Sequence, residues 1–147
     1  MHKGKLSVLA VLGLASVALA AAHFLSASAT RQGDNLVVTF REAGLGNNQN
    51  ITVQTSASST AVYYCFNNAG KNPAAANKRS IQSLVSDSGS FTSDKNGSLS
   101  GTLTLSPPEP GFSCPAGQSM VLQSVTYTSV IVKDMTNNVS TTIAGTF

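Results

Sequence analysis

The sequence predicts an all-β protein, an antiparallel β-sandwich of seven or eight short strands with one disulfide. Apolar and polar residues alternate with a period of two through most of the chain after residue 30, as in half-buried strands. Gly, Pro and Asn interrupt the alternation at short intervals, and this part of the chain shows no helical periodicity. Strands with one apolar face need a second sheet to cover that face, which favours two stacked sheets over a small closed barrel.

Each strand is predicted from its own run of alternating residues. The first expected strand places Leu36 and Phe40 on one face. Asn96-Gly97 can adopt the positive φ angles of a tight turn, so the runs on either side are expected to pair as a hairpin. A shift of phase between Leu122 and Val125 predicts a β-bulge in the longest strand. The expected strands are residues 36–40, 51–55, 60–66, 80–86, 88–93, 98–106, 119–134 and 139–143.

The chain contains two cysteines, Cys65 and Cys114, so only one intramolecular disulfide can form. An even number of cysteines in an exported protein indicates a disulfide, because compartments outside the cytosol are oxidising. The bond would close a loop of about 50 residues and stabilise the fold by about 4 kcal/mol in the chain-entropy description.

The run Thr60-Ala61-Val62-Tyr63-Tyr64-Cys65 resembles the strand before the second cysteine of antibody variable domains. In that family an earlier cysteine and a core tryptophan precede this strand. Here Cys65 is the first cysteine, and the chain has no tryptophan. The resemblance therefore implies an Ig-like or Greek-key sandwich with a disulfide between its sheets, and it implies nothing about antigen binding.

The first 29 residues have the order of a secretory signal peptide. A basic head, Met1–Lys5, precedes an uncharged run rich in Leu, Val and Ala over Leu6–Ala22. Ala27-Ser28-Ala29 then offers a small-x-small cleavage site. We expect a secreted protein whose mature single domain covers residues 30–147 and does not span a membrane.

Other fates of this leader stay open. The small-x-small rule also fits cleavage after Ala20 or Ala22, and Leu6–Leu25 is nearly long enough to remain as a membrane anchor. Cleavage after Ala20 would leave Ala21-Ala22-His23 at the terminus, where an amine, two amide nitrogens and an imidazole can chelate copper or nickel in a square plane. Cleavage after Ala29 would remove this histidine. We expect the Ala29 site and no functional metal site.

The mature part of the chain is poorly supplied for catalysis and for phosphate binding. Loss of the leader removes both histidines and reduces the nine Lys and Arg residues to seven, against six acidic residues. A nucleophile would then need a rarer base, and the scattered carboxylates do not suggest a glycosidase pair. Only Lys78 and Arg79 are adjacent basic residues, so no basic stripe predicts nucleic-acid binding. We expect no enzymatic activity, no cofactor and no nucleic-acid partner.

A small sugar site is one candidate for ligand contact. An exposed tyrosine can stack on a sugar ring, and neighbouring amides can hydrogen-bond to its hydroxyls. The candidate contact residues are Tyr64, Tyr127, Asn67 and Asn68.

A proline-rich stretch is a second candidate. Its prolines and the cysteine at its end are expected to make it stiff and protruding, as in protease inhibitors of the rigid-loop type. Its residues include Pro107, Pro108, Pro110 and Phe112. Separately, sequons for N-glycosylation occur at Asn50, Asn96 and Asn138.

These observations favour a small secreted, non-enzymatic protein of the cell surface, a coat or a matrix, which acts by contact. The alternative is an extracellular binding module for a glycan or a protein, including a rigid-loop protease inhibitor. The surface is rich in Ser, Thr, Asn and Gly, which suits either function and also leaves self-association open.

Overall fold

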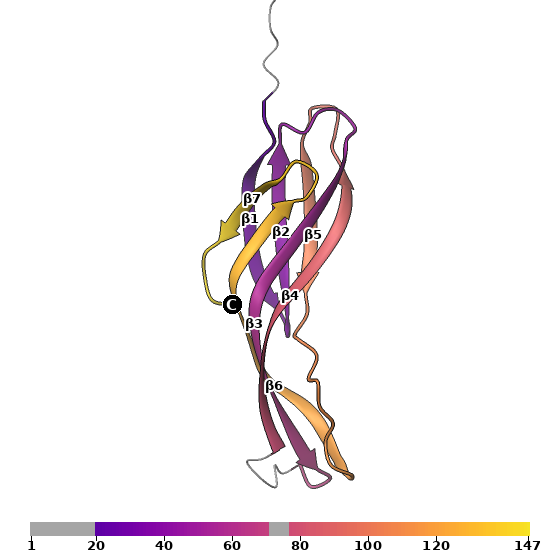
Figure 1. The fold of residues 1–147 in the computed structure, drawn as a ribbon, viewed down its shortest axis with the longest axis vertical. Coiled ribbons are helices and arrows are strands. Elements are labelled where there is room, and N and C mark those ends of the chain that lie inside the picture. Colours follow the sequence, from indigo (N-terminus) through magenta and orange to yellow (C-terminus); the bar gives the residue numbers. More distant parts are fainter. Residues whose placement is uncertain (1–19, 71–76) are drawn as a thin grey trace, which may run out of the picture.

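The computed structural model describes residues 20–70 and 77–147, which form seven antiparallel strands in two sheets (Figure 1). The smaller sheet has the order β1-β2-β5, and the larger sheet has the order β4-β3-β6-β7. The strands are β1 (His23–Gln32), β2 (Asn35–Ala43), β3 (Asn50–Asn67), β4 (Lys78–Thr92), β5 (Leu99–Leu105), β6 (Gln118–Asp134) and β7 (Val139–Ile143). The prediction of an all-β fold with two antiparallel sheets is confirmed. Among the described residues there is no helix with the length and apolar character needed to cross a membrane.

The core lies between the two sheets and consists of the apolar residues that alternate along their facing sides. The Phe40 ring of β2 contacts Phe24 of β1 and Phe91 of β4 edge to face, with ring centroids 6.3 and 5.2 Å apart. Gly101 of β5 leaves room for these rings, because a Cβ atom there would lie 2.5 Å from the Phe40 ring. Other buried core residues include Leu36, Val38, Ile51, Val53, Ala57, Ala61, Val130 and Val132.

β1 includes residues that the sequence analysis assigns to the leader. Residues 23–29 pair with β2, with a single register shift just after Phe24. The side chains of Phe24, Ala27 and Ala29 pack against the core. Cleavage after Ala29 would remove these contacts and leave most of β2 without a partner on that side. Residues 1–19, which carry the basic head and most of the apolar run, lie outside the described residues.

β3 and β4 are longer than the sequence predicts. Each joins two expected strands into one, over Asn50–Asn67 and Lys78–Thr92. In β3, Ser56 and Ser58 continue the alternation on the solvent side while Ala57 and Ser59 are buried, and in β4 the single residue Asp87 joins the two runs, so nothing in these stretches ends the strand. The predicted bulge in β6 is confirmed, because the register shifts between the pairs that Val62 and Tyr63 make with this strand.

The expected hairpin around Asn96-Gly97 is wrong. β4 pairs with β3, whereas β5 pairs with β2, so this turn connects the two sheets. Its local geometry is still a tight turn. Asp94 Oδ1 accepts the backbone N–H groups of Asn96 and Ser98 at 2.8 and 3.0 Å. Good turn chemistry fixes a reversal of the chain, but it does not decide whether the flanking strands pair with each other.

Three strands continue well beyond the end of the smaller sheet (Figure 1). The smaller sheet ends where Leu36 pairs with Leu105, at the level of Tyr127 in β6. Beyond that level the larger sheet extends as a narrow, twisted ribbon of three strands. We call this ribbon the arm, and it consists of residues 60–67 of β3, 78–82 of β4 and 118–126 of β6.

The segment between β5 and β6, residues 106–117, covers the inner face of the arm. We call it the proline segment. Pro108 is buried, and its carbonyl oxygen accepts the Tyr63 hydroxyl at 2.8 Å. Burial raises the pKa of Tyr63, with smaller contributions from nearby acidic groups. The Arg79 guanidinium lies 5.2 Å from the centroid of the Phe112 ring. The expectation of a protruding loop is therefore corrected, because the arm has an apolar inner face that this segment shields from water.

The disulfide between Cys65 and Cys114 is confirmed. Cys65 is a buried residue of β3, and Cys114 belongs to the proline segment. The bond therefore fixes the proline segment to the arm. The antibody-like pattern implied a bond between strands of the two sheets, and this expectation is corrected. Its two cysteines are 49 positions apart in the chain.

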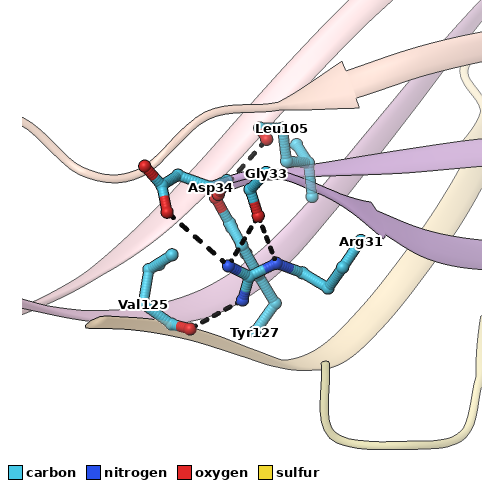
Figure 2. A network of polar contacts seen from close by, with 6 residues as sticks. All are labelled: Arg31, Gly33, Asp34, Leu105, Val125 and Tyr127. Atoms are coloured by element: carbon cyan, nitrogen blue, oxygen red, sulfur yellow. Dashed lines mark hydrogen bonds and ion pairs between the residues drawn. The ribbon is translucent and has the colours of Figure 1, made fainter. Parts of the chain in front are cut away.

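A polar network closes the sandwich at the base of the arm (Figure 2). Arg31 donates to the carbonyl oxygen of Val125 at 2.7 Å and, through Nη2, to that of Gly33 at 2.9 Å. The Tyr127 hydroxyl donates to the carbonyl oxygen of Asp34 at 2.8 Å. These bonds tie the β1–β2 turn to β6, so the arm starts from a fixed point of the sandwich.

Candidate functional site

Our candidate site is the outer face of the four-stranded sheet β4-β3-β6-β7. The odd-numbered residues of β3 from Ile51 to Cys65 are buried, whereas the even-numbered ones point away from the core. Residues directly opposite one another in neighbouring strands share a face. The register of β3 with β4 and β6 therefore identifies the outer residues of all three strands. We call this surface the outer face.

Hydroxyl groups dominate the outer face along most of its length. Their side chains stand in rows on adjacent strands, and most of them are at least partly exposed. They can donate and accept hydrogen bonds at regular intervals. The hydroxyl residues are Thr52, Ser56, Ser58 and Thr60 of β3, Ser80, Ser86, Ser88, Ser90 and Thr92 of β4, and Ser119, Ser124, Thr126 and Thr128 of β6.

The arm end of the outer face carries aromatic side chains. Tyr64 and Phe66 are both half-buried, and their rings are nearly parallel, with centroids 6.0 Å apart and planes inclined by 26°. Lys78, the partner of Tyr64 in β4, holds its ammonium group 5.1 Å from the centroid of the tyrosine ring. Val121 of β6, opposite Tyr64 on the other side, is 41% exposed. We call these four residues the aromatic patch.

The outer face has very little charge. Lys78 and Lys133 lie opposite outer residues of β3, and none of the outer positions in β3, β4, β6 and β7 is acidic. The acidic residues of these strands, Asp87 and Asp134, point toward the other side. This charge balance is less favourable for a strongly basic partner than for an uncharged or mildly acidic one.

The sequence-predicted contact residues have different fates. Tyr64 lies in the aromatic patch, and Asn68 is exposed at the end of the arm. Asn67 adjoins the patch, and its Oδ1 accepts the backbone N–H of Ala69 at 3.0 Å. Tyr127 is fully buried, so the expectation that it contacts a ligand is corrected. Burial raises its pKa, and its hydroxyl is occupied by the backbone of Asp34.

Phe66 was not singled out from the sequence. It lies two residues after Tyr64 in the same strand, which places both rings on the same face. This spacing could have predicted the aromatic pair from the sequence. The three sequon asparagines, Asn50, Asn96 and Asn138, are all exposed.

A buried carboxyl lies between the sheets, away from the outer face. Glu42 of β2 is fully buried, and its neighbour is Asp134 of β6, which is also fully buried. The pKa of Glu42 is raised to about 8, mainly by loss of hydration and to a smaller extent by the hydrogen bonding and the charge of Asp134. The Asp134 carboxylate is already occupied by the backbone N–H groups of Thr136 and Asn137, at 2.7 and 2.9 Å. This pair is enclosed by the core and offers no site to a ligand from solution.

Side-chain metal ligands do not gather in the part of the chain that the structure describes, where no three His, Cys, Asp or Glu side chains come together. The outer face with its aromatic patch is thus the surface that we consider as the functional site. No model of a known protein family and no curated protein matches this sequence.

Proposed function

We propose that this protein is a small exported, non-enzymatic protein of the cell surface or matrix that acts by contact with a polysaccharide. The contact surface is the aromatic patch, continued by the hydroxyl rows of the outer face. The observation that carries the proposal is the Tyr64–Phe66 pair, which stays half-exposed on the solvent side of a sheet. Tyrosine and phenylalanine rings on that side of a sheet contribute little to the core of the domain itself.

The chemistry of the surface matches that of a sugar chain. The C–H-rich face of a pyranose can stack on an aromatic ring, while its hydroxyl groups exchange hydrogen bonds with Ser, Thr and amide side chains. The outer face offers both kinds of group along a single direction, that of the strands. Lys78 adds one positive charge at the patch, which suits a carboxylate or sulfate on an acidic polysaccharide.

Export is supported by independent features. The basic head, the apolar run and the small-x-small sites at the start of the chain have the order of a secretory leader. The Cys65–Cys114 disulfide is the kind of bond that persists in oxidising surroundings. An exported protein with an uncharged, hydroxyl-rich face meets polysaccharides of the cell surface or matrix directly.

The test is a pull-down with insoluble cellulose, chitin, a β-1,3-glucan and a calcium–alginate gel, which separates neutral from acidic polysaccharides. We expect the protein to be retained by at least one of them. Replacement of Tyr64 or Phe66 by Ser should weaken that retention by up to about tenfold for each ring, since an aromatic contact is worth about 0.5–1.5 kcal/mol.

Two further variants serve as controls. Tyr64→Phe retains the ring and should bind like the unchanged protein, which separates stacking from loss of folding. Leu25→Ser replaces a 52%-exposed apolar residue of β1, in the other sheet, and should also bind normally. Absence of binding to all four polysaccharides, or binding that survives Tyr64→Ser and Phe66→Ser together, would contradict the proposal.

A further inference from the structure

We propose that the mature chain begins at Ala21 and that its first three residues, Ala21-Ala22-His23, form a square-planar site for Cu(II) or Ni(II). The inference rests on the export proposed above, and it goes beyond it in naming a cleavage position and a ligand. Its basis is the way the first described residues are built into the fold.

The structure shows where the folded domain needs its first residue. Residues 23–29 form most of β1 and carry core side chains, so cleavage after Ala29 would damage the sandwich. Ala22 is itself half-buried against the core. The backbone of Ala21 and Ala20 runs against Gly44, where a Cβ atom would collide first with the Ala21 carbonyl group and would lie 2.8 Å from the Ala20 oxygen. The side chain of Ala22 and the nearest backbone contact of Gly44 thus lie at residues 21 and 22.

A cleavage site lies immediately before this point. Ala18-Leu19-Ala20 satisfies the small-x-small rule and follows the apolar run directly. Cleavage after Ala20 keeps every contact of β1 and of the two residues that lead into it. Cleavage after Ala20 gives up only the approach of the Ala20 carbonyl to Gly44, whereas cleavage after Ala22 would also remove the nearer Ala21 carbonyl and the half-buried Ala22, so we favour Ala20.

A chain that starts with Ala21-Ala22-His23 carries four nitrogen ligands in sequence. These are the terminal amine, the backbone nitrogens of Ala22 and His23, and the imidazole Nδ1. Nitrogen ligands in a plane are the arrangement preferred by Cu(II) and Ni(II). Binding releases the protons of the two amide nitrogens, and of the amine where it is protonated, to the solvent. The site needs no other side chain, so it does not depend on a cluster of acidic or histidine residues.

The local geometry suits this site. The His23 side chain is exposed, and its Nδ1 already turns back to the Ala21 backbone, 2.8 Å from the carbonyl oxygen. In the complex the same nitrogen would turn from that oxygen to the metal. His23 is the first residue of β1, opposite Ala43. The metal therefore affects the last pair of the β1–β2 ladder and the two residues before it, and the strand from Phe24 onward stays in place.

The surroundings add no competing ligand. The hollow that contains His23 is lined by Gly44, Gly46, Asn47 and Lys95, and no carboxylate lines it. An ammonium group is not a ligand while it is protonated. Asn47 and Asn96 also line the hollow, but their amide oxygens suit harder cations, whereas nitrogen ligands suit Cu(II) and Ni(II).

The experiment uses the full chain expressed in a secreting host. Protein from the medium is sequenced from its N-terminus and then titrated with Cu(II) and with Ni(II), and the copper form is examined by electron paramagnetic resonance. We expect Ala21 as the first residue, one Cu(II) per chain and a spectrum of four nitrogens in a plane. His23→Ala should lose the tight site. Ala22→Pro, which lacks one coordinating N–H, should lose the four-nitrogen spectrum while it keeps the imidazole.

Lys95→Ala is the matched control, because it changes the same hollow without touching a ligand, and it should bind copper normally. A secreted chain that starts at any residue other than Ala21 overturns the metal site but leaves export standing. Retention of the full-length chain inside the cell overturns export and the site together. A chain that starts at Ala21 but lacks a tight Cu(II) site, or an equally tight site in His23→Ala, overturns the chelate alone.

Discussion

The buried carboxyl of Glu42 makes the stability of this protein depend on pH in an unusual direction. Its pKa of about 8 in the folded protein compares with an ordinary value of 4.5 in the unfolded chain. Folding therefore holds a proton on Glu42 between these two values. The stability that the neutral side chain confers is fully present below pH 4.5 and is lost as the pH rises through 8.

The size of the effect follows from the two pKa values. The full difference corresponds to an upper limit of about 5 kcal/mol, and about 3.5 kcal/mol of it falls between pH 5 and pH 8. The free energy of unfolding should therefore decrease by up to this amount across that interval. Most paired carboxyls act in the opposite direction, since folding lowers their pKa and their stabilisation is lost in acid.

The variant Glu42→Gln tests this reasoning. A neutral amide of nearly the same shape keeps the packing and removes the titration, so urea unfolding curves should give a nearly flat stability between pH 5 and pH 8. At pH 8 the variant should be the more stable protein. Glu109→Gln, at an exposed carboxyl of the proline segment, is the control and should keep the slope. A slope that persists in Glu42→Gln, or an unchanged protein that gains stability from pH 5 to pH 8, would refute the account.

Two more predictions concern the core and the disulfide. Gly101→Ala places a methyl group 2.5 Å from the Phe40 ring and should lower the free energy of unfolding by about 1–3 kcal/mol in urea denaturation; an unchanged midpoint would show that the aromatic cluster is looser than described. Replacing Cys65 and Cys114 together by Ser should cost about 4 kcal/mol, because it opens a loop of about 50 residues. In that variant, proteases should cut first in the proline segment, and equal resistance of both proteins would contradict its fixation by the disulfide.

Most strand positions could be predicted from the sequence, whereas few of the strand pairings could. Alternation identified the parts of β2, β5 and β7 that form the sandwich, because one face of each strand is buried and the other is wet. It could not show that Asn96-Gly97 joins two sheets, since the partner of a strand depends on residues far away in the chain. Leu36, for example, pairs with Leu105, and nothing local to either residue reveals this.

β1 was not predicted from the sequence, because its residues also match the pattern of a leader. Its inward positions, such as Ala27 and Ala29, are small residues separated by one serine, and the same pattern reads as a small-x-small cleavage site. At Ala27-Ser28-Ala29 the sequence alone therefore cannot distinguish a β-strand from the cleavage site of a leader, because the distinction depends on which residues pack in the core. Phe24 resolves the ambiguity only in the folded structure, where its ring contacts Phe40.

The candidate site was only partly predictable. Tyr64 and Asn67 were expected from residue type, whereas Tyr127 proved to be a core residue. A buried tyrosine is tolerated when its hydroxyl finds a partner, and here that partner is the carbonyl oxygen of Asp34, which is 93 positions away in the chain. The arm could not be foreseen, because it arises from the difference in extent between the two sheets.

The central claim is that the aromatic patch of the arm is a polysaccharide contact surface. The most direct measurement is a titration of isotope-labelled protein with soluble oligosaccharides of cellulose, chitin, β-1,3-glucan and alginate, followed by amide chemical shifts. The account predicts saturable shifts concentrated in the arm, at residues 62–66, 78–82 and 119–124. Shifts that concentrate in β1, β2 and β5, or no shift with any sugar at millimolar concentration, would contradict it.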